Sequence, residues 1–180
     1  GSSARKSVSI APGIEVYGMP PSSAARASTL SLRQTLPTTT RSGRGSRWLG
    51  AKPWRAWASH DGKTMWIPNN GDETVSVLDT KKHDVIATLE AGPDMTGINF
   101  GNGKAYVISS SSSFVYVYDL KTLLPRGRIF FGKNTVLETA TTSPDGGKIY
   151  LCGSNTQALY EIDTKTDRFV EIADIGFFPW

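Results

Sequence analysis

The sequence has few of the side chains that build reactive sites. Its 180 residues include one cysteine, Cys152, and two histidines, His60 and His83. A single cysteine excludes an intrachain disulfide and an all-cysteine metal site, and a metal site would need carboxylates from separate parts of the chain. No P-loop, dinucleotide-binding, zincin or nucleophile-elbow motif is present. We therefore predict no catalytic residue, no metal site and no cofactor on this chain.

Long apolar runs are also missing. No stretch approaches the ~20 apolar residues that a transmembrane helix needs, and no apolar run of a secretory signal follows the basic start. No segment shows a convincing helical period of 3.6 residues, so we expect little helix. The 38% content of hydrophobic residues is nevertheless enough for a packed core. The sequence thus predicts a folded, β-rich chain without a transmembrane segment.

Acidic residues are scarce at the start of the chain. Residues 1–47 contain seven basic side chains and one acid, Glu15, a net charge of +6 against +4 for the whole chain, which leaves about −2 for the rest. The segment is rich in Ser, Thr, Pro and Gly and buries too little apolar surface to offset its ordering entropy. We interpret it as a basic arm or linker. A solvated tail is favoured over a nucleic-acid or membrane contact, a transit peptide also fits, and no specific nucleic-acid partner is predicted.

From Trp48 onward a unit of about 40 residues recurs three times. Within each unit a hairpin turn precedes a short apolar strand, and an aspartate follows an alternating strand. A period of this length in a β-rich sequence is typical of propeller blades. The markers are turn glycines spaced by 41 and 43 residues and aspartates spaced by 40 and 44 residues: Gly62, Gly103 and Gly146, and Asp79, Asp119 and Asp163. We expect strands at 64–67, 105–108 and 148–152, at 75–77, 115–117 and 159–162, and at 85–89.

The stretch from 59 to 92 closely resembles the YVTN-type β-propeller repeat, and the resemblance extends over about residues 50–180. It implies an all-β fold of four-stranded antiparallel blades in a propeller that usually has seven. Relatives include surface-layer proteins, lactonase-like enzymes, haem-binding propellers of the nitrite reductase type and amine dehydrogenase heavy subunits, and this range favours a periplasmic or extracellular location. The implied division is a basic arm at 1–47 and a partial propeller at 48–180, with repeats at about 50–91, 92–131 and 132–175.

Three units do not close a ring, because propellers generally have four to eight blades. Residues 176–180 have the same form as Gly50 to Trp54, which leads into the first unit, so we interpret them as the start of a further repeat. Open blade faces would expose apolar surface and favour association. We expect a partial propeller that is completed by further sequence or by other protein chains.

The resemblance also implies where a ligand would bind. In such propellers the segment that leads into each innermost strand lies at the rim of the central channel. Haem-binding relatives have a histidine after the proline of this segment, where Trp54 and Asp94 stand here, which counts against a haem ligand in these blades. The channel-rim candidates for ligand binding are Pro53, Trp54, Pro93, Asp94, Pro179 and Trp180.

The remaining unusual residues have ordinary structural interpretations. We expect the tryptophans near residue 50 to fill space between blades rather than stack on a ligand. His60 lies in a hairpin turn of sequence Ser-His-Asp-Gly, where a turn role is favoured over catalysis. Cys152 is expected to behave as a small buried hydrophobe, and the serines from Ser109 to Ser113 form either a flexible loop or a polar contact.

Two functions remain open at this stage. The first is a non-catalytic binding or scaffold propeller that mediates protein–protein contacts. The second, drawn from the resemblance, is the propeller part of a periplasmic redox enzyme such as an amine dehydrogenase heavy subunit, with the cofactor on another chain. The absence of a catalytic motif favours the first, although a fold alone does not determine function.

Overall fold

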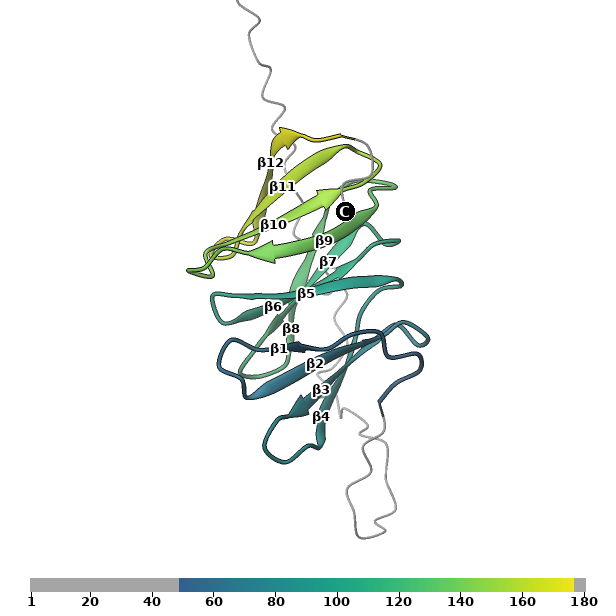
Figure 1. Ribbon diagram of the computed structural model, residues 1–180, viewed down its shortest axis with the longest axis vertical. Coiled ribbons are helices and arrows are strands. Elements are labelled where there is room, and N and C mark those ends of the chain that lie inside the picture. The colour runs from purple at the N-terminus through teal and green to yellow at the C-terminus, as the bar shows by residue number, and fades with distance from the viewer. Residues whose placement is uncertain (1–48, 177–180) are drawn as a thin grey trace, which may run out of the picture.

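A computed structural model describes residues 49–176 of the protein; the arm at 1–47, Trp48, Pro179 and Trp180 lie outside the described residues. All twelve regular elements of the described part are β-strands, and they form three antiparallel sheets of four strands each (Figure 1). Four consecutive strands make up each sheet, so every repeat folds as one unit. Within 49–176 no helix is long and apolar enough to cross a membrane.

The three sheets match the three predicted blades and keep the chain order from the first strand to the fourth. We call them blades 1, 2 and 3. Each predicted strand lies within a strand of the structure, and the first strand of blade 1 has only two residues. Blade 1 contains β1 (Trp57–Ala58), β2 (Thr64–Asn69), β3 (Thr74–Asp79) and β4 (Val85–Glu90); blade 2 contains β5 (Met95–Gly101), β6 (Lys104–Ser109), β7 (Phe114–Asp119) and β8 (Pro125–Phe130); blade 3 contains β9 (Leu137–Thr142), β10 (Lys148–Gly153), β11 (Ala158–Asp163) and β12 (Arg168–Asp174).

The aspartate at the end of each third strand closes the turn that follows. Asp79 Oδ1 accepts hydrogen bonds from the backbone N–H groups of Lys81 and Lys82 at 2.9 and 2.8 Å. Asp119 and Asp163 accept the same pair of bonds in their own turns. A side-chain acceptor of this kind satisfies turn N–H groups that a strand ladder cannot reach. The repeated aspartate is therefore a structural residue.

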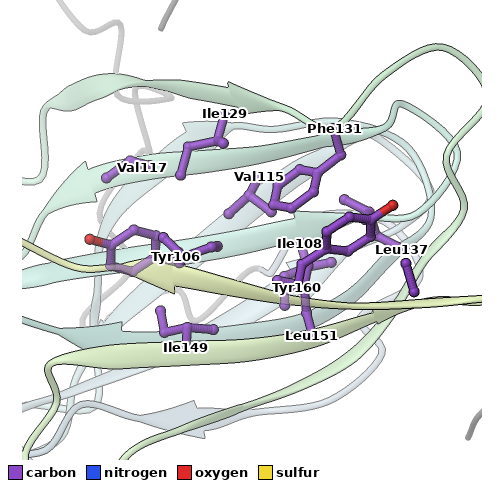
Figure 2. Packing of buried hydrophobic residues seen from close by; sticks show 12 residues of the cluster. Tyr106, Ile108, Val115, Val117, Ile129, Phe131, Leu137, Ile149, Leu151 and Tyr160 are labelled. Atoms are coloured by element: carbon purple, nitrogen blue, oxygen red, sulfur yellow. The ribbon is translucent and has the colours of Figure 1, made fainter. Parts of the chain in front are cut away.

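The blades stack face to face, with blade 2 in the middle (Figure 1). One core cluster lies between blades 1 and 2, and the second lies between blades 2 and 3. Figure 2 shows the second cluster, in which Tyr106 and Ile108 of blade 2 face Ile149 and Leu151 of blade 3; all four side chains are fully buried. Because successive strand residues point to opposite faces, each middle blade needs apolar residues on both faces. This requirement explains why every residue of β6 is buried.

Candidate functional site

The two proline-containing lead-in segments differ in register from the sequence-based alignment. Lys52 and Asp94 both have a left-handed backbone, with φ of 50° and 49°, and their carbonyls accept from the backbone N–H groups after β2 and β6 at 3.1 and 3.0 Å. Pro53 then pairs with Asn69, the last residue of β2, as Met95 pairs with the last residue of β6. Trp54 therefore corresponds to the residue after Met95 and not to Asp94.

Trp54 is the most exposed large apolar side chain of the described residues. It is 59% exposed, its backbone N–H donates to the Pro68 carbonyl at 3.0 Å, and the Arg55 guanidinium lies 5.5 Å from its ring centroid. Trp57, in contrast, is half-buried and packs against the core between blades 1 and 2. The expectation that tryptophans fill space between blades is confirmed for Trp57 and wrong for Trp54, whose ring is available for contacts.

Asp94 and Pro93 are engaged by the serine loop between β6 and β7. The Ser111 hydroxyl donates to the Asp94 carboxylate, and the Ser109 hydroxyl donates to the Pro93 carbonyl at 2.5 Å. The Ser112 hydroxyl in turn donates to Ser109 Oγ at 2.7 Å. Of the two interpretations, the serine run therefore forms polar contacts that tie this loop to the lead-in segment of its own blade. The Asp94 carboxylate already has a partner.

A contact that the sequence did not reveal joins blades 1 and 2 beside these residues. Asn70, in the loop after β2, accepts from the Met95 backbone N–H at 2.9 Å and donates to the Met95 carbonyl at 3.3 Å. These two bonds satisfy the backbone N–H and C=O groups of Met95, the first residue of β5. No strand of blade 1 pairs with β5, so the Asn70 side chain makes this link instead. An asparagine after a strand is too common a pattern to predict such a contact.

The two histidines lie in turns of the described residues, and the cysteine lies in β10. The Ser59 hydroxyl donates to Asp61 Oδ1 at 2.8 Å, so it closes the hairpin turn and is not paired with His60. His83 is exposed in the turn between β3 and β4. Cys152 is half-buried, and burial together with the nearby Glu138 charge raises the pKa of its thiol. A thiol with a raised pKa is mostly protonated near neutral pH and is a weak nucleophile.

A buried polar network joins blades 2 and 3. Lys104 Nζ lies 2.5 Å from Asp167 Oδ1, and the exposed fractions of the two side chains are 9% and 22%. The Tyr106 hydroxyl donates to the same carboxylate at 2.6 Å. Burial, followed by the Asp167 hydrogen bond and charge, holds the pKa of Tyr106 far above its ordinary value. Tyr106 therefore stays protonated and acts as a structural donor.

A small cavity within the described residues holds about 10 Å³, room for roughly one water molecule. It lies beside β8 and Asp167, away from the predicted channel rim. Within 49–176 no three His, Cys, Asp or Glu side chains converge as a metal site would require.

Comparison with known proteins agrees with this architecture. The Seven-bladed beta-propeller protein Rv1057 of Mycobacterium tuberculosis is 29% identical over 137 aligned positions, with 67% of this chain and 32% of that protein covered. Residues 49–176 are thus blades of a β-propeller. The propeller described here thus spans about a third of the length of the curated relative that it matches. No family model matches the sequence.

Solved structures place the same propeller fold in proteins of different kinds. The hydrazine synthase of Kuenenia stuttgartiensis has a TM-score of 0.61 at 22% identity, with 77% of this chain and 41% of that chain covered. Virginiamycin B lyase from Staphylococcus aureus has a TM-score of 0.59 at 16% identity, with 72% and 44% covered. Likeness at such identities shows the fold and not the activity.

Proposed function

We propose that this chain is part of a larger β-propeller that acts as a non-catalytic scaffold for protein–protein contacts. The observation that supports the proposal is the outer face of blade 3. On blade 2 the corresponding face is fully buried against the next blade, with Tyr106 and Ile108 at 0% exposure. On blade 3 the residues at the same positions, Tyr150 and Cys152, are only half-buried. A sheet face of this kind is an interaction surface.

The rim residues supply a second contact region in this proposal. Trp54 is exposed and rigidly attached through its backbone bond to Pro68. Exposed tryptophans are frequent anchors of protein interfaces because they bury a large area at a small cost in side-chain entropy. Pro53, Pro93, Asp94 and, outside the described residues, Pro179 and Trp180 complete the proposed rim.

The experiment is the isolation of the tagged chain from its native source, followed by mass measurement, chemical cross-linking and absorption spectroscopy. We expect an assembly heavier than the 19.5 kDa chain, with cross-links at Lys52. A stable, isolated monomer of 19.5 kDa would contradict the proposal. Trp54→Ala should weaken rim cross-links, whereas Leu124→Ala, which removes an exposed side chain from an outer turn, is the matched control.

The same preparation tests the alternative, a propeller part of a redox enzyme with its cofactor on another chain. A quinone or haem band in the visible spectrum of the assembly would favour that alternative. A spectrum without absorption above the aromatic region favours the scaffold. This second function rests on the resemblance of the repeats to those of amine dehydrogenase heavy subunits.

A further inference from the structure

The outer face of blade 3 repeats the polar residues of the blade 2 face. Lys104 and Tyr106 are the first and third residues of β6, and Lys148 and Tyr150 are the first and third residues of β10. In both strands these two side chains point away from the preceding blade. The same pair therefore occurs once in a buried interface and once on a face that no described residue covers.

The carboxylate partner of the lysine comes from a different place in the two cases. In the buried interface the next blade supplies it, because Asp167 lies in the turn between β11 and β12. On the outer face Lys148 Nζ lies 2.9 Å from Glu161 Oε1 and 3.0 Å from Asp163 Oδ2, both on blade 3 itself. These two carboxylates raise the pKa of Lys148 to about 12. Blade 3 thus supplies its own counter-charges.

Glu161 occupies the place that an apolar residue has on blade 2. Glu161 is opposite Tyr150 in the β10–β11 pair, as Val117 is opposite Tyr106 in the β6–β7 pair. A blade that covered this face with an acid at the position of Asp167 would bring a third carboxylate to a single ammonium group. A buried carboxylate without its own cation has a large desolvation cost. The covering surface must therefore be non-acidic at this point.

The direction of the chain indicates which blade covers the face. β4 leads through Ala91 to Asp94 into the blade that covers β2, and β8 leads through Phe131 to Val136 into the blade that covers β6. By the same rule the blade after β12 covers β10. Between blades 2 and 3 the first strands, β5 with seven residues and β9 with six, lie side by side. A second copy of this chain would instead place its β1, which has only two residues, beside β9. A second copy therefore fits less well.

We propose that the outer face of blade 3 docks the propeller blade that follows β12 in the polypeptide, and that this blade has a non-acidic residue at the position of Asp167. The inference rests on the proposed function, since it requires a larger propeller. Glu161 distinguishes the two faces. It pairs with Lys148 inside blade 3, whereas Val117 stands at its position on blade 2 and Lys104 receives the carboxylate of Asp167 from the next blade.

The test inserts a second copy of residues 133–176 between Gly176 and Phe177 of the full chain. The copy has Cys152→Ala, so that the original Cys152, on the outer face of β10, is the only thiol. Two versions differ at one position of the copy, with Asp167 retained or replaced by Asp167→Asn. Each is made with Glu161 and with Glu161→Val in the original blade 3. The rate of thiol labelling of Cys152 reports whether the inserted blade covers the face.

With Glu161 present, the Asp167→Asn copy should slow labelling by about tenfold or more relative to the 180-residue chain, as expected when the open state is a minor one. The copy with Asp167 should protect Cys152 less. With Glu161→Val the advantage of the Asp167→Asn copy should become smaller, because Lys148 then keeps only Asp163 and can pair with the incoming carboxylate. This dependence on Glu161 separates charge from folding, since all four proteins contain the same inserted strands.

Several outcomes would overturn the inference. Better protection by the Asp167 copy in the presence of Glu161 would contradict the charge rule and leave the scaffold proposal intact. Absence of protection in all four proteins would show that the face is not a docking surface for a blade. Self-association of the 180-residue chain with protection of Cys152 would assign the face to a second copy instead. The mass and spectrum of the native assembly test the proposed function independently of all three.

Discussion

The interface between blades 1 and 2 and the interface between blades 2 and 3 use one backbone arrangement and two chemistries. In the first, Trp66 is the third residue of the second strand, and its ring lies 5.9 Å from Phe100 and 6.2 Å from Tyr118. In the second, Tyr106 takes that place and donates to Asp167. The residue at the position of Asp167 in blade 2 is Leu123, which packs on the apolar cluster.

The difference shows that stability and specificity are distributed unequally along the stack. The apolar interface gains from burial and requires only a good fit. The polar interface buries Lys104, and its desolvation cost is offset only when Asp167 is in place. We infer that the second interface discriminates between neighbouring blades more sharply than the first.

The largest effect should come from Trp66→Ala, which removes the centre of the apolar interface. Trp66 is 0% exposed, and truncation of a buried aromatic side chain costs about 3–5 kcal/mol. Urea unfolding of the full chain measures the change in the free energy of unfolding. Trp54→Ala is the control, because this exposed side chain should change that free energy by less than about 0.5 kcal/mol. Similar losses for the two variants would contradict the described packing.

Asp167→Ala should be the next largest change, because it leaves Lys104 buried without its counter-charge. Breaking a buried pair costs about 3–5 kcal/mol; since Asp167 keeps 22% exposure, we expect the lower end of that range. Leu123→Ala at the corresponding position of blade 2 should cost less, about 1–2 kcal/mol of lost apolar burial. The same urea measurement compares the two variants, and a larger loss for Leu123→Ala would break the proposed contrast.

The double variant Lys104→Met with Asp167→Leu sharpens this comparison. Replacement of a buried ion pair by apolar residues is often neutral or stabilising, so the double variant should recover most of the stability that Asp167→Ala loses. A double variant as unstable as Asp167→Ala would show that the network contributes through more than its charges. Labelling of Cys152 in the same proteins checks that the fold of blade 3 is unchanged.

Tyr106→Phe should have a smaller effect, about 1 kcal/mol for one lost hydrogen bond. The effect is limited because Asp167 stays paired with Lys104. The Thr164 carbonyl also still accepts a hydrogen bond from the Asn102 side-chain amide at 3.3 Å. Thermal unfolding compares Tyr106→Phe with Tyr118→Phe, which removes a hydroxyl that donates to the Glu90 carbonyl between blades 1 and 2. A much larger loss for Tyr106→Phe would indicate that the network is cooperative.

The smallest effect concerns acid pH and the turn aspartates. The hydrogen bonds of Lys63 and Ser59 to Asp61, and those of Lys148 and the turn N–H groups to Asp163, lower both pKa values from 3.8 to about 2. A lowered folded-state pKa adds stability that is present above the unfolded value and is lost as the pH falls from 3.8 towards about 2. Asp163→Asn should flatten this part of the profile of unfolding free energy against pH. An unchanged profile would contradict the assignment.

The fold could be predicted from the sequence because its determinants are local and recur three times. A turn glycine such as Gly62 and a turn aspartate such as Asp79 mark each hairpin, and the strands between them alternate in polarity. The contacts between blades could not be predicted in the same way. The Lys104–Asp167 pair joins residues 63 positions apart, and the pairing appears only when the blades are stacked.

The candidate rim was predicted only through the resemblance, and its register needed the structure. Pro53 and Pro93 look equivalent because each follows a glycine closely, but the backbone gives Pro53 the place that Met95 has in the next repeat. A proline in a loop can occupy several neighbouring positions of a turn. The sequence pattern therefore located the lead-in segment, but it did not show which of its residues correspond between repeats.

The turn residues His83, Leu123 and Asp167 have φ values of 59°, 58° and 57°. Three side chains of different chemistry occupy one left-handed conformation, which the preceding aspartate holds in place in every blade. A residue can therefore be exchanged here without a change in the backbone, at a site that reaches the neighbouring repeat. Duplication of a repeat followed by substitution of this single codon would give a new pairing preference, so the turn is a place where an evolving array, or a designed one, sets the order of its blades.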